Sequence, residues 1–112
     1  MEDKITYEDF RKVDMRIGRI IDVQDFTEAR KPSYRLKIDF GKEIGIKNSS
    51  AQITDYKKEE LIGRQVVAVI NFQPKQIANF KSEVLTLGLA GGKKGWLLIQ
   101  PEREVELGVR VE

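Results

Sequence analysis

The 112-residue sequence contains neither cysteine nor histidine. Without cysteine, the chain has no disulfides, no thiolate nucleophile and no cysteine-ligated zinc. Without histidine, it lacks the commonest general base near neutral pH and the commonest metal ligand. Serine–histidine and cysteine–histidine mechanisms are therefore excluded, and no carboxylate pair or clustered ligand spacing stands out. We expect a protein that is not an enzyme, with no catalytic residue, no metal site and no cofactor.

Long apolar runs are also missing. No run approaches the roughly 20 residues that cross a bilayer, so we expect no membrane insertion. Residues 1–4 are acidic where a signal peptide would be basic, and no apolar stretch follows them. We therefore expect the chain to stay in the cytoplasm. The length favours a single domain over residues 1–112, and a hydrophobic content of 40% is enough for one modest core.

Acidic residues are scarce in one part of the chain. The net charge is only +2, but Glu83 is the single acid between Gly63 and Pro101. A locally basic stretch is what a phosphate-binding face requires. By itself, however, this distribution is more typical of an ordinary solvated surface, so charge alone does not identify a ligand.

The hydrophobic pattern predicts mostly strands. Residues 34–40 alternate between apolar and polar side chains, and residues 65–70 are apolar on both faces, as in a central strand. Residues 15–23 predict a long strand with Ile17, Ile21 and Val23 on one face, and with Gly18 at a bulge or bend. The remaining predicted elements are a helix at 6–11, strands at 43–47, 83–89, 96–99 and 105–111, a helix at 55–62 ended by Gly63, and a hairpin tip at 91–95.

This order of elements predicts an all-β fold with short helices. A short helix between the third and fourth of five core strands is the order of a five-stranded Greek-key barrel of the OB-fold type, here with N- and C-terminal extensions. A different small β-barrel or a half-open sandwich is the alternative, because order alone does not fix topology. OB-folds bind oligonucleotides on one strand face and its loops.

Residues 71–83 have the composition of a nucleic-acid contact. They carry two lysines, two phenylalanines, two asparagines and two glutamines, with no acid before Glu83. Lysines neutralise phosphate, aromatic rings stack on bases, and amides form hydrogen bonds with base edges or sugar hydroxyls. We expect Lys75 and Lys81 to lie together on one outward-facing flank of the barrel.

Six motifs along the chain resemble the tRNA-binding domain family, which includes domains appended to methionyl-tRNA synthetases. They are DMRIGRI at 14–20, IDFG at 38–41, EIGIKNSSAQIT at 43–54, LIGRQV at 61–66, NFQPK at 71–75 and IANFKSEVL at 77–85. The third and sixth motifs most resemble the stand-alone CsaA subfamily. The resemblance spans nearly the whole chain and implies an OB-fold, a homodimer, tRNA binding and a chaperone role in protein export.

One segment departs from the family pattern. The wider family has Ser-x-Gly-Met after its basic loop, and those residues contribute to tRNA contact. Here Ser82 is kept, but Val84 and Leu85 replace glycine and methionine. The close backbone approach that glycine permits is therefore lost, which implies a different contact with tRNA.

Pattern and resemblance together give two sets of candidate residues. For RNA, or tRNA in particular, they are Arg16, Arg35, Asn71, Lys75, Lys81 and Ser82; for unfolded preproteins in the same or a nearby cleft, they are Phe72, Ile77 and Phe80. Parity places Arg16 and Arg35 outward on neighbouring strands. Asn71 either reads a base edge or caps a turn. The pattern favours burial for Phe80 and exposure for Phe72, and it places Trp96 in the core or at a subunit interface.

Overall fold

The computed structural model describes residues 3–93 and 95–112. Its elements in chain order are α1 (Tyr7–Arg11), β1 (Met15–Asp25), β2 (Tyr34–Asp39), β3 (Ile46–Ala51), α2 (Lys58–Leu61), β4 (Gln65–Val69), β5 (Lys75–Ile77), β6 (Phe80–Ser82), β7 (Leu85–Thr86), β8 (Gly88–Ala90) and β9 (Trp96–Leu98). No helix in the described ranges is long and apolar enough to span a membrane.

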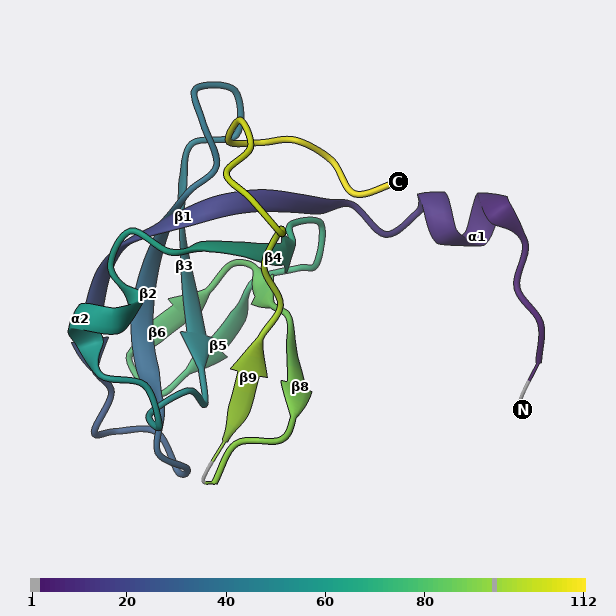
Figure 1. The fold of residues 1–112 in the computed structure, drawn as a ribbon. Coiled ribbons are helices and arrows are strands. Elements are labelled where there is room, and N and C mark those ends of the chain that lie inside the picture. Colours follow the sequence, from purple (N-terminus) through teal and green to yellow (C-terminus); the bar gives the residue numbers. More distant parts are fainter. Residues whose placement is uncertain (1–2, 94) are drawn as a thin grey trace.

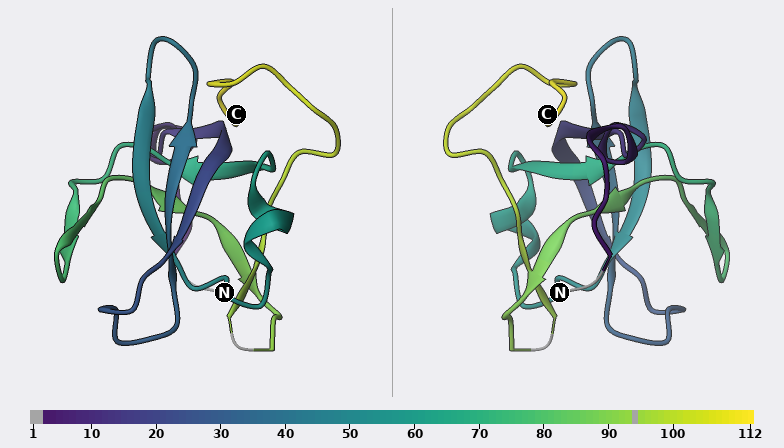
Figure 2. Two further views of the ribbon diagram at one scale, coloured as in Figure 1. Left: turned by 90° about the vertical axis from the view of Figure 1, so that its left-hand side faces the viewer. Right: turned by 90° about the vertical axis from the view of Figure 1, so that its right-hand side faces the viewer.

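Five antiparallel strands form one curved sheet in the order β3-β2-β1-β4-β7. Figures 1 and 2 show these strands wrapping around a common core, so that the sheet becomes a nearly closed barrel. β5–β6 and β8–β9 form two separate two-stranded hairpins. The prediction of an all-β, OB-type five-stranded barrel with short helices is confirmed.

The two strands with the clearest sequence patterns contribute much of the core. Leu36, Ile38 and Phe40, on or directly after β2, are almost completely buried. All five residues of β4 are buried as well, because β4 lies between β1 and β7. The alternating pattern of β2 therefore correctly predicted one buried face, and the apolar run in β4 correctly predicted two.

β1 differs from its predicted face pattern. Ile17 and Val23 are buried as expected, but Ile20 is completely buried and Ile21 is 41% exposed. The register between β1 and β2 shifts between Ile20 and Asp22. This β-bulge inserts an extra residue, which reverses the alternation in the middle of the strand.

Gly18 lies two residues before that irregularity and has a different role. A Cβ atom there would lie 2.5 Å from Cγ2 of Ile38 and 2.7 Å from Cε1 of Phe40. The prediction of a bulge or bend at Gly18 is therefore corrected: glycine allows the barrel core to pack directly against the β1 backbone.

β3 starts later than predicted. Residues 43–47 were expected to form it, but the strand runs from Ile46 to Ala51. Gly41 and Gly45 both have positive φ, and the Gly45 N–H donates to the Gly41 carbonyl at 2.7 Å. The turn between β2 and β3 is therefore longer than expected, and Ser49 and Ser50 lie within the strand itself.

Both predicted helices form, but α2 is shorter than predicted: it runs from Lys58 to Leu61, whereas residues 55–62 were expected to be helical. Thr6 caps α1: its hydroxyl accepts from the Asp9 N–H at 3.1 Å, and Asp9 accepts from the Thr6 N–H in return. Gly63, with φ of +89°, follows the end of α2. Figure 1 shows α1 lying beyond the start of β1 and away from the barrel, as an N-terminal extension.

The last third of the chain contains less strand than predicted. In place of one strand over 83–89, the structure has the short strands β7 and β8, and Leu85 and Leu89 are exposed. Trp96 is 43% exposed, which removes the core alternative for this residue. The predicted hairpin tip at 91–95 does join β8 to β9, although residue 94 lies outside the described residues.

The predicted edge strand at 105–111 is absent. Gly108 has φ of +90° and breaks the extended run, so only a single bridge forms, between Arg110 and Arg16. The segment still lies against β1: the Gly108 N–H donates to the Ile17 carbonyl at 2.8 Å, and the Ile17 N–H donates to the Val109 carbonyl at 3.0 Å. The C-terminal segment is thus a bonded extension without strand geometry.

Candidate nucleic-acid interface

A cleft of about 870 Å³ lies beside the β5–β6 hairpin. Its walls come from the β1–β2 loop, the end of β3, the β5–β6 hairpin, the segment through β7, and β9. Phe72, Ile77, Leu85 and Trp96 are among the apolar side chains that line it, and Phe72 is 56% exposed. The cleft therefore offers aromatic and aliphatic surface to a ligand.

The β5–β6 hairpin carries both predicted lysines, but on different faces. Lys75 pairs with Ser82, Gln76 with Lys81, and Ile77 with Phe80. Because side chains alternate along a strand and paired residues share a face, Lys75 lies on one face and Lys81 on the other. Lys75 lines the cleft and Lys81 does not. The expectation that the two lysines share one flank is corrected: they share a hairpin, not a face.

Both lysines are exposed, and neither forms an ion pair with any residue that the structure describes. The acid of this segment, Glu83, accepts a hydrogen bond from the Asn48 N–H at 2.9 Å. Neither lysine is therefore neutralised by a carboxylate of its own chain, which leaves both charges available to an anion.

Arg35 sits in the middle of an aromatic cluster. Its Cζ lies 4.8 Å from the ring centre of Phe26 and 5.5 Å from that of Phe80. The guanidinium also donates to the Glu28 carboxylate at 3.1 Å. The pKa of Glu28 is lowered by a hydrogen bond from its own backbone N–H and next by the hydrogen bond from Arg35. Phe80 is half-buried in this contact.

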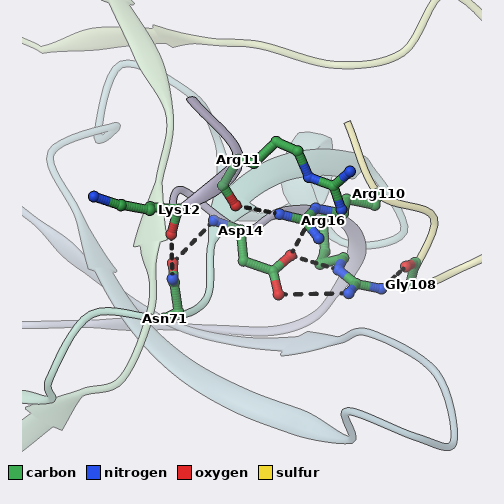
Figure 3. Close-up of polar contacts among 7 residues, drawn as sticks. All are labelled: Arg11, Lys12, Asp14, Arg16, Asn71, Gly108 and Arg110. Atoms are coloured by element: carbon green, nitrogen blue, oxygen red, sulfur yellow. Dashed lines mark hydrogen bonds and ion pairs between the residues drawn. The ribbon is translucent and has the colours of Figure 1, made fainter. Parts of the chain in front are cut away.

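Arg16 and Asn71 lie together at the start of β1 (Figure 3). Arg16 Nε bonds Asp14 Oδ1 at 2.6 Å, which is the main reason why the pKa of Arg16 is raised. The Asn71 side chain accepts from the Asp14 N–H at 3.0 Å and donates to the Lys12 carbonyl at 2.6 Å. Asn71 was expected either to read a base edge or to cap a turn. In the structure its side-chain amide forms hydrogen bonds with backbone groups of the same chain.

The distance between Arg16 and Arg35 follows from the strand register. Gln24 of β1 pairs with Arg35, and Arg16 lies eight residues further back along β1. At the usual rise of a strand this is roughly 26 Å. The structure therefore brings Arg35, Lys75, Lys81 and Ser82 together and leaves Arg16 and Asn71 elsewhere.

Ser82 connects the hairpin to the barrel. Its hydroxyl accepts from the Ser50 N–H at 3.2 Å and donates to the Val84 carbonyl at 3.4 Å. Val84 is buried, whereas Leu85 is 47% exposed and lines the cleft. Of the two residues that replace the family's glycine and methionine, Val84 thus belongs to the core and borders the cleft, and Leu85 presents its side chain on the cleft wall.

Two cations that were not among the predicted RNA-binding residues also line the cleft. Arg30 and Lys31, in the β1–β2 loop, are both exposed and form no ion pair within the described ranges. We call Arg30, Lys31 and Lys75 the rim cations. The sequence feature that could have identified them is a pair of adjacent cations in the loop between the first two strands, because OB-folds bind oligonucleotides with that loop.

A family model described as "Putative tRNA binding domain" matches residues 15–110. The chain therefore belongs to the tRNA-binding domain family. The CsaA chaperone proteins are its structural neighbours within that family. The structure of CsaA from Picrophilus torridus has a TM-score of 0.92 and 57% identity, and covers 97% of this chain and 100% of its own. CsaA from Bacillus anthracis has a TM-score of 0.91 and 49% identity, with coverage of 98% and 100%.

Curated relatives include larger proteins. The methionine–tRNA ligase of Pyrococcus furiosus is 40% identical over 112 residues, which is 96% of this chain but only 14% of the ligase. The chain thus spans about one seventh of the length of this relative. The family match concerns a tRNA-binding domain, whereas the full-length ligase also carries a catalytic domain. The predicted CsaA-type resemblance is confirmed.

Proposed function

We propose that this chain binds structured RNA, and tRNA in particular, at the cleft beside the β5–β6 hairpin. The observation that carries the proposal is the group of rim cations, which lie around an apolar cleft without carboxylate partners among the described residues. Phosphates would lie against Arg30, Lys31 and Lys75, and Phe72 would stack on an exposed base. Membership of the tRNA-binding domain family supports this ligand.

The other predicted residues contribute in different ways. Lys81, on the far face of the hairpin, would add to the positive field and contact a more distant phosphate. Arg16, Asn71 and Ser82 would support the site indirectly, because their polar atoms bond the chain's own backbone and side chains. We therefore propose a graded set in which the rim cations matter most.

The salt dependence of tRNA binding tests this proposal. Each phosphate contact contributes about 0.7–0.9 to the slope of log K against log salt, so Lys75→Ala should weaken binding and flatten the slope by that amount. The double variant Arg30→Ala/Lys31→Ala should flatten it by about twice as much. Lys42→Ala, in the exposed β2–β3 turn and outside the cleft, is the matched control.

Two outcomes would contradict RNA binding at this cleft. If Lys75→Ala and Arg30→Ala/Lys31→Ala both keep the unmodified affinity and slope, RNA does not bind at this cleft. If Lys42→Ala changes the slope as much as Lys75→Ala, binding reflects overall charge and not this site.

A second candidate function is the binding of unfolded or extended polypeptide. The specific observation is the set of exposed apolar side chains on the cleft wall, Phe72, Leu85 and Trp96. A cleft of about 870 Å³ has the size of a ligand pocket. Two similar solved structures are described as CsaA chaperones. Ile77 and Phe80, predicted for this role, would contribute from the hairpin.

Salt separates the two candidates. Apolar contacts persist at high salt, whereas phosphate contacts weaken. Retention of a chemically unfolded client at 1 M salt, with loss in Phe72→Ser, would support polypeptide binding. No retention at any salt concentration would rule it out.

We also propose that the chain acts as a cytoplasmic homodimer. Exposed Leu89, Trp96 and Leu97 on the β8–β9 hairpin provide apolar surface for a second copy. Two linked sites on one RNA would raise affinity through effective concentration. Sedimentation equilibrium measures the state directly: a monomeric mass at all concentrations up to those used for RNA binding would contradict it.

A further inference from the structure

The Arg35 side chain lies between two segments that carry the proposed RNA contacts. Phe26 begins the β1–β2 loop, which holds Arg30 and Lys31, and Phe80 belongs to the hairpin that holds Lys75. The two rings meet edge-on at 5.4 Å between centres, with an interplanar angle of 64°. The Arg35 guanidinium lies within cation–π distance of both. Arg35 is therefore in contact with both sides of the cleft rim.

The polar atoms of Arg35 are also directed toward these segments. Its NH2 group donates to Glu28 of the loop at 3.1 Å and to Asn79 of the hairpin turn at 3.5 Å. Its Nε is buried and has no hydrogen-bond partner within the described ranges. We call Phe26, Glu28, Arg35, Asn79 and Phe80 the Arg35 cluster. Because Glu28 already balances its charge, Arg35 presents a weaker field to a phosphate than the rim cations do.

The hairpin needs such a contact. β5 and β6 have three residues each and form a sheet of their own, and an isolated two-stranded hairpin is marginal in water. Figure 2 shows this hairpin standing out from the barrel. Its base is bonded to β3 through Ser82 and Ser50, and its turn, at Ala78 and Asn79, is bonded to the barrel through the Arg35 cluster.

We infer that Arg35 is a positioning residue for RNA binding, which holds the β5–β6 hairpin against the β1–β2 loop and so keeps Lys75 on the same rim as Arg30 and Lys31. It is not itself a phosphate contact, which differs from the role that sequence reasoning gave it. The inference rests on the proposed RNA-binding function, since the geometry it maintains is that of the rim cations.

Hydrogen exchange and tRNA binding of Arg35→Met test the inference together. Loss of a cation–π contact should speed amide exchange in residues 75–82 by about 2- to 30-fold, with β4 amides unchanged. Affinity for tRNA should fall about 2-fold or more, because the competent hairpin position is less populated. The salt slope should stay unchanged, since the same phosphates are contacted in the bound state. Arg35→Lys should restore part of both effects.

A second variant tests the aromatic contacts of the Arg35 cluster. Phe80→Leu should speed the same hairpin amides while keeping the charge of Arg35. The positioning role is overturned if hairpin exchange stays unchanged in Arg35→Met, if β4 exchange rises equally, or if the salt slope flattens by about 0.7–0.9 as for a phosphate contact. If the unmodified protein binds no tRNA, the proposed function fails, whereas the exchange measurement still decides whether Arg35 holds the hairpin.

Discussion

Replacing Ser49 by alanine tests how the barrel closes between β3 and β7, the two edge strands of the five-stranded sheet. The Ser49 side chain is completely buried. Its hydroxyl donates to the Val84 carbonyl at 3.2 Å and lies 2.8 Å from the Thr86 hydroxyl. A serine hydroxyl has one proton, so Thr86 is the donor in the second bond. These side-chain bonds add to the two backbone bonds that the Asn48 carbonyl accepts at the same seam.

The expected cost follows from the number of bonds. Each buried hydrogen bond contributes about 0.5–1.5 kcal/mol net, so Ser49→Ala should lower the free energy of unfolding by about 1–3 kcal/mol. Ser82 also donates to the Val84 carbonyl, at 3.4 Å, so that group keeps one donor when Ser49 is replaced. The main loss is therefore the acceptor of the Thr86 hydroxyl.

Equilibrium urea unfolding measures this cost, with an unchanged m-value showing that the unfolded surface is the same. Ser50→Ala is the matched control: the Ser50 hydroxyl forms no side-chain hydrogen bond within residues 3–93 and 95–112, so the change should stay within about 0.5 kcal/mol. A cycle with Thr86→Val should give a coupling of about 0.5–1.5 kcal/mol. Additive effects, or a Ser49→Ala cost no larger than the control, would refute the idea that these hydroxyls close the barrel.

Two further predictions concern β1. Gly18→Ala should destabilise the fold by about 1–3 kcal/mol, because its Cβ would overlap Ile38, whereas Gly91→Ala, near only a flexible leucine side chain, should cost much less in thermal unfolding. The pKa of Glu104 is lowered from its ordinary value of 4.5 mainly by a hydrogen bond from Arg19. The stability this gives is present above that value and is lost as the pH falls through the lower, folded-state pKa. Urea titrations of wild type and Glu104→Gln should therefore differ at pH 7 and converge in acid; a constant difference would exclude the ion pair as its source.

The sequence predicts strands most reliably where one face pattern holds over a whole element. β2 alternates without interruption and β4 is apolar from Val66 to Val69, and both have the predicted burial. β1 shows where this reasoning stops. Its bulge reverses the alternation after Ile20, and a bulge depends on pairing with another strand, which the pattern of one strand does not contain.

For the candidate site, too, some features could be predicted from the sequence and others depended on the tertiary structure. The composition of residues 71–83 and the family motifs point to the hairpin and to RNA, and the family is confirmed. The roles of single residues needed coordinates. The side chains of Asn71 and Arg16 form their hydrogen bonds near the start of β1. An asparagine or arginine side chain bonds whichever partner the fold places beside it, and the sequence does not show which partner that is. Arg30 and Lys31 reach the cleft only because the loop that carries them lies across from the hairpin.

By itself, the order of apolar and polar residues determined a small β-barrel, since hydrophobic period is a local property that each segment carries with it. Tertiary structure decided which charges meet. Lys75 and Lys81 are six residues apart and look equivalent in the sequence, yet the pairing of β5 with β6 puts them on opposite faces of the hairpin, and Lys75 lines the cleft whereas Lys81 does not. The direction of a side chain on a hairpin is set by strand register, and register is fixed only when the two strands pair.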